Sequence, residues 1–176
     1  LRELVALGAC DPGARDAHGG TALLWAAGSG HLDVCEYLVG ECGAAPDDAG
    51  GNRFGRQPIH WASRNGHLDV VRWLVARRGV PADARTLDGT TALHLAAWRG
   101  HVAVARWLVE RGGASVGAVN DFGCNAIQWA AQTGDLAMCR WLLAAGLDVA
   151  LPNVNGHNAL HKAAIKNRTA LCAWLL

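Results

Sequence analysis

Residues 89–109 read GTTALHLAAWRGHVAVARWLV, and the rest of the chain repeats this pattern. A glycine stands two residues before each of five related segments: TALLWAA (21–27), QPIHWAS (57–63), TALHLAA (91–97), NAIQWAA (125–131) and NALHKAA (158–164). These glycines are 36, 34, 34 and 33 residues apart. Repetition at a period of about 20–50 residues is typical of stacked repeat proteins, so we expect five stacked units.

Each unit carries the start and stop signals of a short helix. Four of the five segments begin with a side chain that can accept a hydrogen bond from the free amides of a first helical turn: Thr21, Thr91, Asn125 and Asn158. Gln57 is a weaker cap, but Pro58 follows it at the first helical position, where proline is well tolerated. About two turns later come residues that accept the left-handed conformation of a helix end: Gly30, Gly66, Gly100, Gly134 and Asn167. A second apolar pattern of helical period follows at once, so each unit is predicted to be a helix pair.

Two positions hold the same residue in every unit. The first predicted helix always has the small side chain of alanine at one slot: Ala26, Ala62, Ala96, Ala130 and Ala163. The second always has a leucine, preceded by Tyr or Trp: Leu38, Leu74, Leu108, Leu142 and Leu175. One short helix pair cannot bury such a face, whereas pairs stacked about 8–10 Å apart form a continuous core. We therefore expect an all-α fold, a solenoid of stacked helix-turn-helix units.

These residues resemble the ankyrin repeat family. TALH at 91–94 and GHLDVVRWLV at 66–75 are similar to the family pattern, Asp-x-x-Gly-x-Thr-Pro-Leu-His with a later Gly-His-Leu. The pattern is incomplete, because the His is replaced by Leu24 and Gln128 in two units and the Pro occurs only at Pro58. The resemblance covers nearly the whole chain. It implies that the segment before each glycine forms a β-hairpin-like finger loop, and that the fingers and first helices line a concave surface.

The repeats divide a single ankyrin-repeat domain over residues 1–176. We expect a partial repeat at 1–14, with a second helix at 1–9, and a truncated final repeat at 154–176. The complete repeats would be 15–52, 53–86, 87–120 and 121–153. Because the chain begins with Leu and ends on an apolar run, we expect both ends to be cut from a longer protein.

The slots beside the finger glycine vary most between units, as expected where packing does not fix the residue. On the inferred concave side, aromatic and arginine side chains recur in the second to fourth units, and interface hot spots are rich in both. Trp98 is informative because other units hold unrelated residues in its slot: Gly28, Arg64, Gln132 and Ile165. An alternative role for Trp98 is to cover the adjacent helix end. The candidate partner-binding residues are Arg53, Phe54, Arg56, Arg64, Asp88, Trp98, Arg99, Phe122 and Gln132.

The histidines and motifs do not indicate catalysis. Six of the eight histidines fall in two repeated slots, His60, His94 and His161 in one and His31, His67 and His101 in the other. The first slot can bond backbone near the start of the first helix, and the second lies at the opening of the second helix, so a structural role is favoured over metal ligation. We find no HExxH, no paired zinc spacing, no nucleophile elbow and no phosphate or dinucleotide loop. We therefore expect no catalytic residue, no metal, no cofactor and no small-molecule substrate.

The cysteines favour an intracellular, reduced chain, because they lack CxxC spacing. Cys35, Cys139 and Cys172 share a slot of the second helix whose other occupants are apolar, which predicts core thiols. Cys124 differs because it follows a finger glycine, a position that indicates exposure; a reactive thiol there is the less favoured alternative, because no basic neighbour would lower its pKa.

Charge and hydropathy limit the classes of partner. Sixteen basic and fifteen acidic residues give a net charge of +1, so no global field attracts nucleic acid or an anionic membrane. Arg72, Arg106 and Arg140 would form a stripe on the second helices, but Asp69 lies three residues before Arg72 and predicts an ion pair on a solvated surface. No apolar run is long enough to span a bilayer. We expect a cytoplasmic protein, with an organelle or the nucleus left open.

Together these features predict a non-catalytic protein–protein recognition or scaffolding module. Its partner, a single protein or a large complex, would bind the concave surface of fingers and first helices. Two alternatives remain open: a structural subunit embedded in a large multi-protein assembly, and a regulatory or targeting domain of a longer enzyme or channel.

Overall fold

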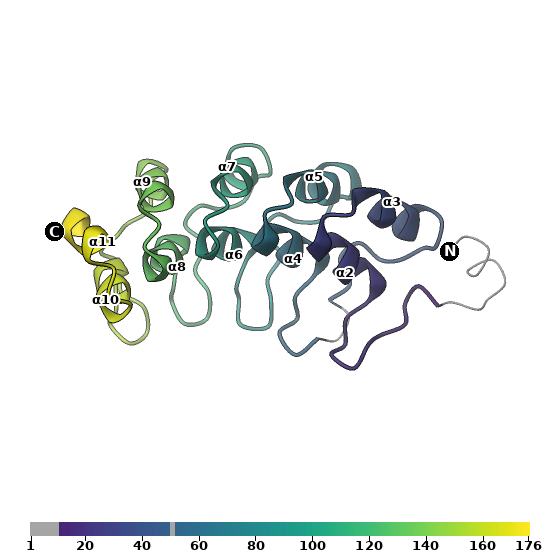
Figure 1. Ribbon diagram of the computed structural model, residues 1–176, viewed down its shortest axis with the longest axis horizontal. Coiled ribbons are helices and arrows are strands. Elements are labelled where there is room, and N and C mark those ends of the chain that lie inside the picture. The colour runs from purple at the N-terminus through teal and green to yellow at the C-terminus, as the bar shows by residue number, and fades with distance from the viewer. Residues whose placement is uncertain (1–10, 50–51) are drawn as a thin grey trace.

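A computed structural model describes residues 11–49 and 52–176 of the chain. Helices in this part are α2 (Ala22–Ser29), α3 (Leu32–Gly40), α4 (Pro58–Asn65), α5 (Leu68–Arg72), the π-helical η1 (Trp73–Arg77), α6 (Ala92–Trp98), α7 (Val102–Glu110), α8 (Ala126–Thr133), α9 (Leu136–Ala144), α10 (Ala159–Ile165) and α11 (Thr169–Leu175). They form five stacked pairs, so the all-α solenoid is confirmed (Figure 1). The helix expected at 1–9 lies outside the described residues.

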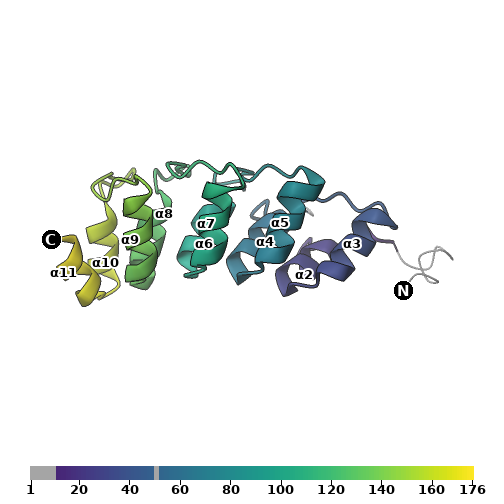
Figure 2. The ribbon, with the colours of Figure 1, turned by 90° about the horizontal axis from the view of Figure 1, so that it is seen from above.

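The pairs stack in two rows. The first helices form one row, in which α2 packs on α4, α4 on α6, α6 on α8 and α8 on α10. The second helices lie beyond them, and the finger loops extend on the opposite side (Figure 1). Seen from above, the successive pairs lie side by side across the long axis (Figure 2).

The expected caps form at the first helices. Thr21 Oγ1 accepts a hydrogen bond from the Leu24 amide at 3.3 Å, and Asn125 Oδ1 accepts one from the Gln128 amide at 3.2 Å. At the end of α10, Asn167 has φ 55°, in the left-handed region that the other units give to glycine. The local signals in the sequence therefore set where these helices begin and end.

The constant slots form the core. The alanine slot is closed to solvent at Ala62, Ala96, Ala130 and Ala163, and Ala26 of α2 is also buried. Leu74, Leu108 and Leu142 are likewise fully buried and belong to the same cluster, which runs through all five pairs. Burying this face against the neighbouring pairs is what stabilises the stack.

The fingers are closed turns rather than strand ladders. A backbone bond of 3.0 Å closes the finger from the Thr86 amide to the Thr90 carbonyl. Single backbone bonds of 3.0 Å then join successive fingers: Leu87 N to Phe54 O, Asp121 N to Asp88 O, and Val154 N to Phe122 O. Within the described residues, one isolated antiparallel β-bridge forms, between Arg15 and Thr21.

Two expectations from the sequence are wrong. Cys124 is buried, because the next finger packs over it and Asn153 Nδ2 lies 3.4 Å from its sulfur. It is therefore not an exposed reactive thiol. Asp69 and Arg72 form no ion pair in the described part of the chain; the Asp69 carboxylate accepts a hydrogen bond from the Val70 amide at 2.9 Å instead.

Candidate partner-binding surface

Six of the nine candidate residues lie together on the side of the fingers and first helices. Arg53, Phe54 and Arg56 come from the finger before α4, Arg64 from the end of α4, and Trp98 and Arg99 from the end of α6 and the residue after it. Trp61, in the middle of α4, lies between them. We call these seven residues the Arg–aromatic row.

Guanidinium groups alternate with ring faces along the row. The guanidinium carbons of Arg53 and Arg56 each lie 4.5 Å from the centre of the Phe54 ring. Arg56 is also 5.5 Å from the Trp61 ring. Such distances allow cation–π attraction, which favours the position of each guanidinium beside the neighbouring ring.

The row continues across the next two repeats. The guanidinium of Arg64 lies between two indoles, 5.4 Å from the Trp61 ring and 5.6 Å from the Trp98 ring. Arg99 is 5.3 Å from the Trp98 ring. Trp98 in turn meets Trp129 edge to face, with ring centres 6.0 Å apart. The contacts therefore connect α4, α6 and α8.

The four arginines of the row have no acidic partner in the described residues. None of their guanidinium groups donates a hydrogen bond there, whereas Arg168 Nε donates to the Gln132 carbonyl at 3.1 Å. Burial, with the charges of neighbouring arginines, lowers the pKa of Arg56 and of Arg64. Because arginine stays charged in proteins, the row carries positive charge, which the nearby Asp88 carboxylate offsets in part at Arg56.

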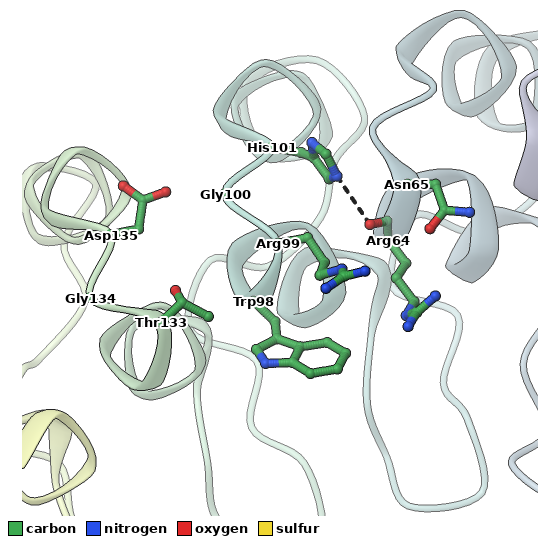
Figure 3. A pocket seen from close by; sticks show the side chains of 9 residues that line it. All are labelled: Arg64, Asn65, Trp98, Arg99, Gly100, His101, Thr133, Gly134 and Asp135. Atoms are coloured by element: carbon green, nitrogen blue, oxygen red, sulfur yellow. Dashed lines mark hydrogen bonds between the residues drawn. The ribbon is translucent and has the colours of Figure 1, made fainter. Parts of the chain in front are cut away.

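Two clefts open beside the row. The central cleft, of about 620 Å³, lies between the ends of α4, α6 and α8 and is lined by Arg64, Trp98, Arg99, Thr133 and Asp135 among others. Figure 3 shows the Arg64 and Arg99 guanidinium groups near the Trp98 ring, with Asp135 farther away beside α9. The His101 ring, at the opening of α7, bonds the Arg64 carbonyl at 3.0 Å and fixes the end of α4.

The N-terminal cleft, of about 860 Å³, lies between the first two repeats. Its walls include Trp25 of α2, Trp61 of α4 and Phe54 of the finger, and Gly28 leaves space between them. Arg64 lines both clefts, so it links the apolar cleft to the charged one.

The other three candidate residues lie apart from the row. Asp88 is committed to its own finger, where its carboxylate accepts bonds from Thr86 Oγ1 at 2.6 Å and the Thr90 amide at 3.2 Å. Burial alone would raise the pKa of Asp88, but these hydrogen bonds outweigh it and lower the pKa. Phe122 is exposed on a finger, and Gln132 is half-buried on α8.

The sequence analysis missed three tryptophans on this surface. Trp25, Trp61 and Trp129 occupy the fifth position of their repeated segments, a periodic signal that was available in the sequence. Trp25 is 58% exposed, and its Nε1 donates to the Asp16 carboxylate at 2.7 Å. Tryptophan also recurs on the second helices, where Trp73 packs in the core, but the slot on the first helices faces the side that carries the fingers.

The histidines of the first helices are structural. His60 Nδ1 accepts from the Gln57 amide at 3.0 Å, and Nε2 bonds the carbonyl of Ala84, just before the following finger, at 2.9 Å. Burial lowers the pKa of His60 and His94 to about 4. In the described residues no group of three or more potential ligands could hold a metal ion. Nor does any described helix have the length and apolar character that crossing a membrane requires.

Comparisons with known proteins agree with this architecture. The family model of ankyrin repeats (3 copies) matches residues 1–86, 42–120 and 112–176. Protein fem-1 homolog A of Rattus norvegicus is 54% identical over 43 residues, which are 24% of this chain and 7% of that protein. Protein fem-1 homolog A-like and homolog A-A of Mus musculus match with the same figures. The matched segment thus spans a small part of these relatives, whereas the family model spans the whole chain. The chain belongs to the ankyrin repeat family.

Proposed function

We propose that the chain is a non-catalytic recognition or scaffolding module that holds a protein partner on the surface of its fingers and first helices. Ankyrin repeats are generally protein–protein interaction modules and typically non-catalytic. The observation that carries the proposal is the Arg–aromatic row. Aromatic and arginine side chains dominate the hot spots of protein interfaces, and here they gather beside two clefts.

The row is not explained by folding alone. Phe54 of the row is 42% exposed, and Phe122, on a finger apart from the row, is 54% exposed, so neither ring is needed to fill the core. Large apolar groups that stand next to cations on one face are better explained by contact with a partner.

The test compares partner capture by the parent chain and by a Trp98→Ala, Phe122→Ala variant, used as bait in a lysate of the native source. Leu143→Ala is the matched control, because Leu143 is exposed on α9 in the other row of helices. We expect the double variant to lose a protein that the parent and the control both retain. The melting temperatures should stay within a few degrees, since neither ring belongs to the core.

An equal set of captured proteins from all three baits would overturn the proposal. It would favour binding through other faces, as in a subunit embedded in a large assembly. Loss of the fold in the double variant would also count against it, because the rings would then be structural.

A further inference from the structure

We infer that the partner segment is an extended acidic peptide, whose carboxylates pair with Arg64 and Arg99 while a neighbouring large apolar side chain enters the N-terminal cleft. This inference rests on the proposed function and specifies the chemistry of the partner. It is carried by charge complementarity, by the orientation of the guanidinium groups and by the adjacency of the two clefts.

The first step concerns unmatched charge. Some arginines of the described chain have acceptors: Arg15 pairs with Asp48 at 3.4 Å, and Arg85 donates to the Val119 carbonyl at 3.0 Å. Others in this part of the chain, such as Arg72, have none but are exposed to water. In the described residues the guanidinium of Arg64 has no acceptor, and its Nε is buried without a partner. A partly buried cation without a counter-ion is costly, and an incoming carboxylate would supply one.

The second step concerns orientation. A guanidinium beside an aromatic ring is attracted to it without using its N–H groups as hydrogen-bond donors, so these groups remain available to an acceptor. Arg64 and Arg99 both lie against the Trp98 ring, so this indole positions two cations at the central cleft. Arginine in a fixed orientation is suited to bidentate recognition of planar carboxylates.

The third step concerns the neighbouring apolar cleft. Gly28 lies between Trp25 and Trp61, and a Cβ placed on it would meet the Trp61 Cβ at 3.4 Å. A larger residue in the Gly28 slot would therefore fill space that the cleft leaves open. Because Arg64 lines both clefts, an acidic residue and a large apolar residue close together in one peptide can occupy both.

A peptide fits this surface better than a nucleic acid. The chain has a net charge of +1, and acidic residues stand among the basic ones, with Asp88 and Asp121 on the fingers and Asp135 in the central cleft. A run of evenly spaced phosphates would pass these carboxylates and be repelled. A peptide can place acidic residues at the arginines and neutral ones elsewhere.

The test uses four fluorescein-labelled probes and fluorescence anisotropy with the full chain. Three are peptides of about 12 residues, which span roughly 40 Å when extended. All have one central tryptophan, flanked by glutamate, by glutamine or by lysine. The fourth is an oligothymidylate with the same charge as the glutamate peptide. Two double variants of the protein are compared. The first carries Arg64→Gln and Arg99→Gln, and the matched control carries Arg72→Gln and Arg106→Gln, whose arginines are exposed on the second helices.

We expect the glutamate peptide to bind at least about ten-fold more tightly than the glutamine peptide, and the lysine peptide not to bind. The Arg64, Arg99 variant should lose about ten-fold in affinity, while the control, with the same change of net charge, stays within about two-fold. An additional probe, the glutamate peptide with its tryptophan replaced by alanine, should bind the protein more weakly than the parent glutamate peptide. Binding should also weaken between about 50 mM and about 500 mM NaCl.

Equal binding of the glutamate and glutamine peptides would overturn the inference. So would tighter binding of the oligothymidylate, or an equal loss in the two arginine variants, which would indicate non-specific charge attraction. If these results appear while partner capture still depends on Trp98 and Phe122, the inference fails and the proposed function stands. If capture is also unaffected, both fail.

Discussion

His60 and His94 show how one residue type joins successive repeats. In each, one ring nitrogen accepts a hydrogen bond from the amide at the helix start, and the other bonds a carbonyl beside or within the following finger, Ala84 for His60 and Cys124 for His94, both at 2.9 Å. Only the neutral ring can accept and donate in this way, because a protonated imidazole has two donors. Burial opposes protonation as well, which accounts for the lowered pKa of both rings.

The chain should therefore lose stability as the pH falls. Unfolded histidine takes up a proton near its ordinary pKa of 6.5, whereas His60 and His94 resist it until about 4. Their contribution is complete above pH 6.5 and is lost progressively down to pH 4, by at most about 3 kcal/mol for each ring. Urea denaturation at several pH values within this window measures the slope.

A His94→Gln variant should have a smaller slope. Gln128 fills the same slot in the next repeat, where its Nε2 donates to the Leu151 carbonyl at 2.7 Å, so glutamine can keep the bond without titrating in this window. His31→Gln is the control, because His31 is exposed at the start of α3. An unchanged slope in His94→Gln, or an equal reduction in His31→Gln, would contradict this account.

At the scale of elements, the fingers before α8 and α10 are each held by an asparagine three residues before the finger glycine. In the finger before α8, Asn120 Oδ1 accepts from the Phe122 amide at 3.2 Å and the Cys124 amide at 2.9 Å. Asn153 makes the equivalent bonds to the amides of Asn155 and His157. The shape of these two fingers therefore depends on one buried side-chain amide more than on strand pairing.

Asn120→Ala should destabilise the chain by about 1–3 kcal/mol, because it leaves two amides of the finger without their acceptor. Asn155→Ala, at an exposed position of the next finger, should stay within about 0.5 kcal/mol. Chemical denaturation followed by circular dichroism gives both values. Equal small effects would show that the turn is held by its backbone bonds alone.

Elements with local signals could be predicted from the sequence, and elements set by neighbours could not. Caps such as Asn125 and stops such as Asn167 act within their own turns, so the helix pairs were predicted correctly. The burial of Cys124 depends on the following finger, which no local pattern reports. The π-helical turn η1 also lay outside what an apolar period can indicate.

At the scale of the whole molecule, the candidate surface was predicted only in part. Arg64 and Trp98 are close in space because α4 and α6 are neighbours in the stack, which the repeat register already implies. Trp61 was missed because the same residue type fills the core on the second helices, as at Trp73. Whether a repeated tryptophan lies on the surface or in the core depends on which side of the stack its slot faces. The residue type alone does not indicate that side.

The stack also predicts how the molecule unfolds. Each pair contacts only its neighbours, so the effect of a cavity should depend on its place along the stack. Leu108 and Leu175 hold the same slot, but Leu108 is fully buried in α7 with pairs on both sides, and Leu175 is half-buried in α11.

Leu108→Ala should cost about 2–5 kcal/mol, and Leu175→Ala distinctly less, because the side chain removed from α11 leaves a smaller cavity. Hydrogen exchange should locate the two effects. In Leu108→Ala, protection should fall in α6 and α7 and in the helices on both sides, whereas in Leu175→Ala it should fall in α10 and α11 only. A uniform loss of protection through all five pairs in both variants would mean that this chain unfolds as one cooperative unit. The nearest-neighbour description would then be wrong for it, because the coupling between pairs would exceed the stability of any single pair.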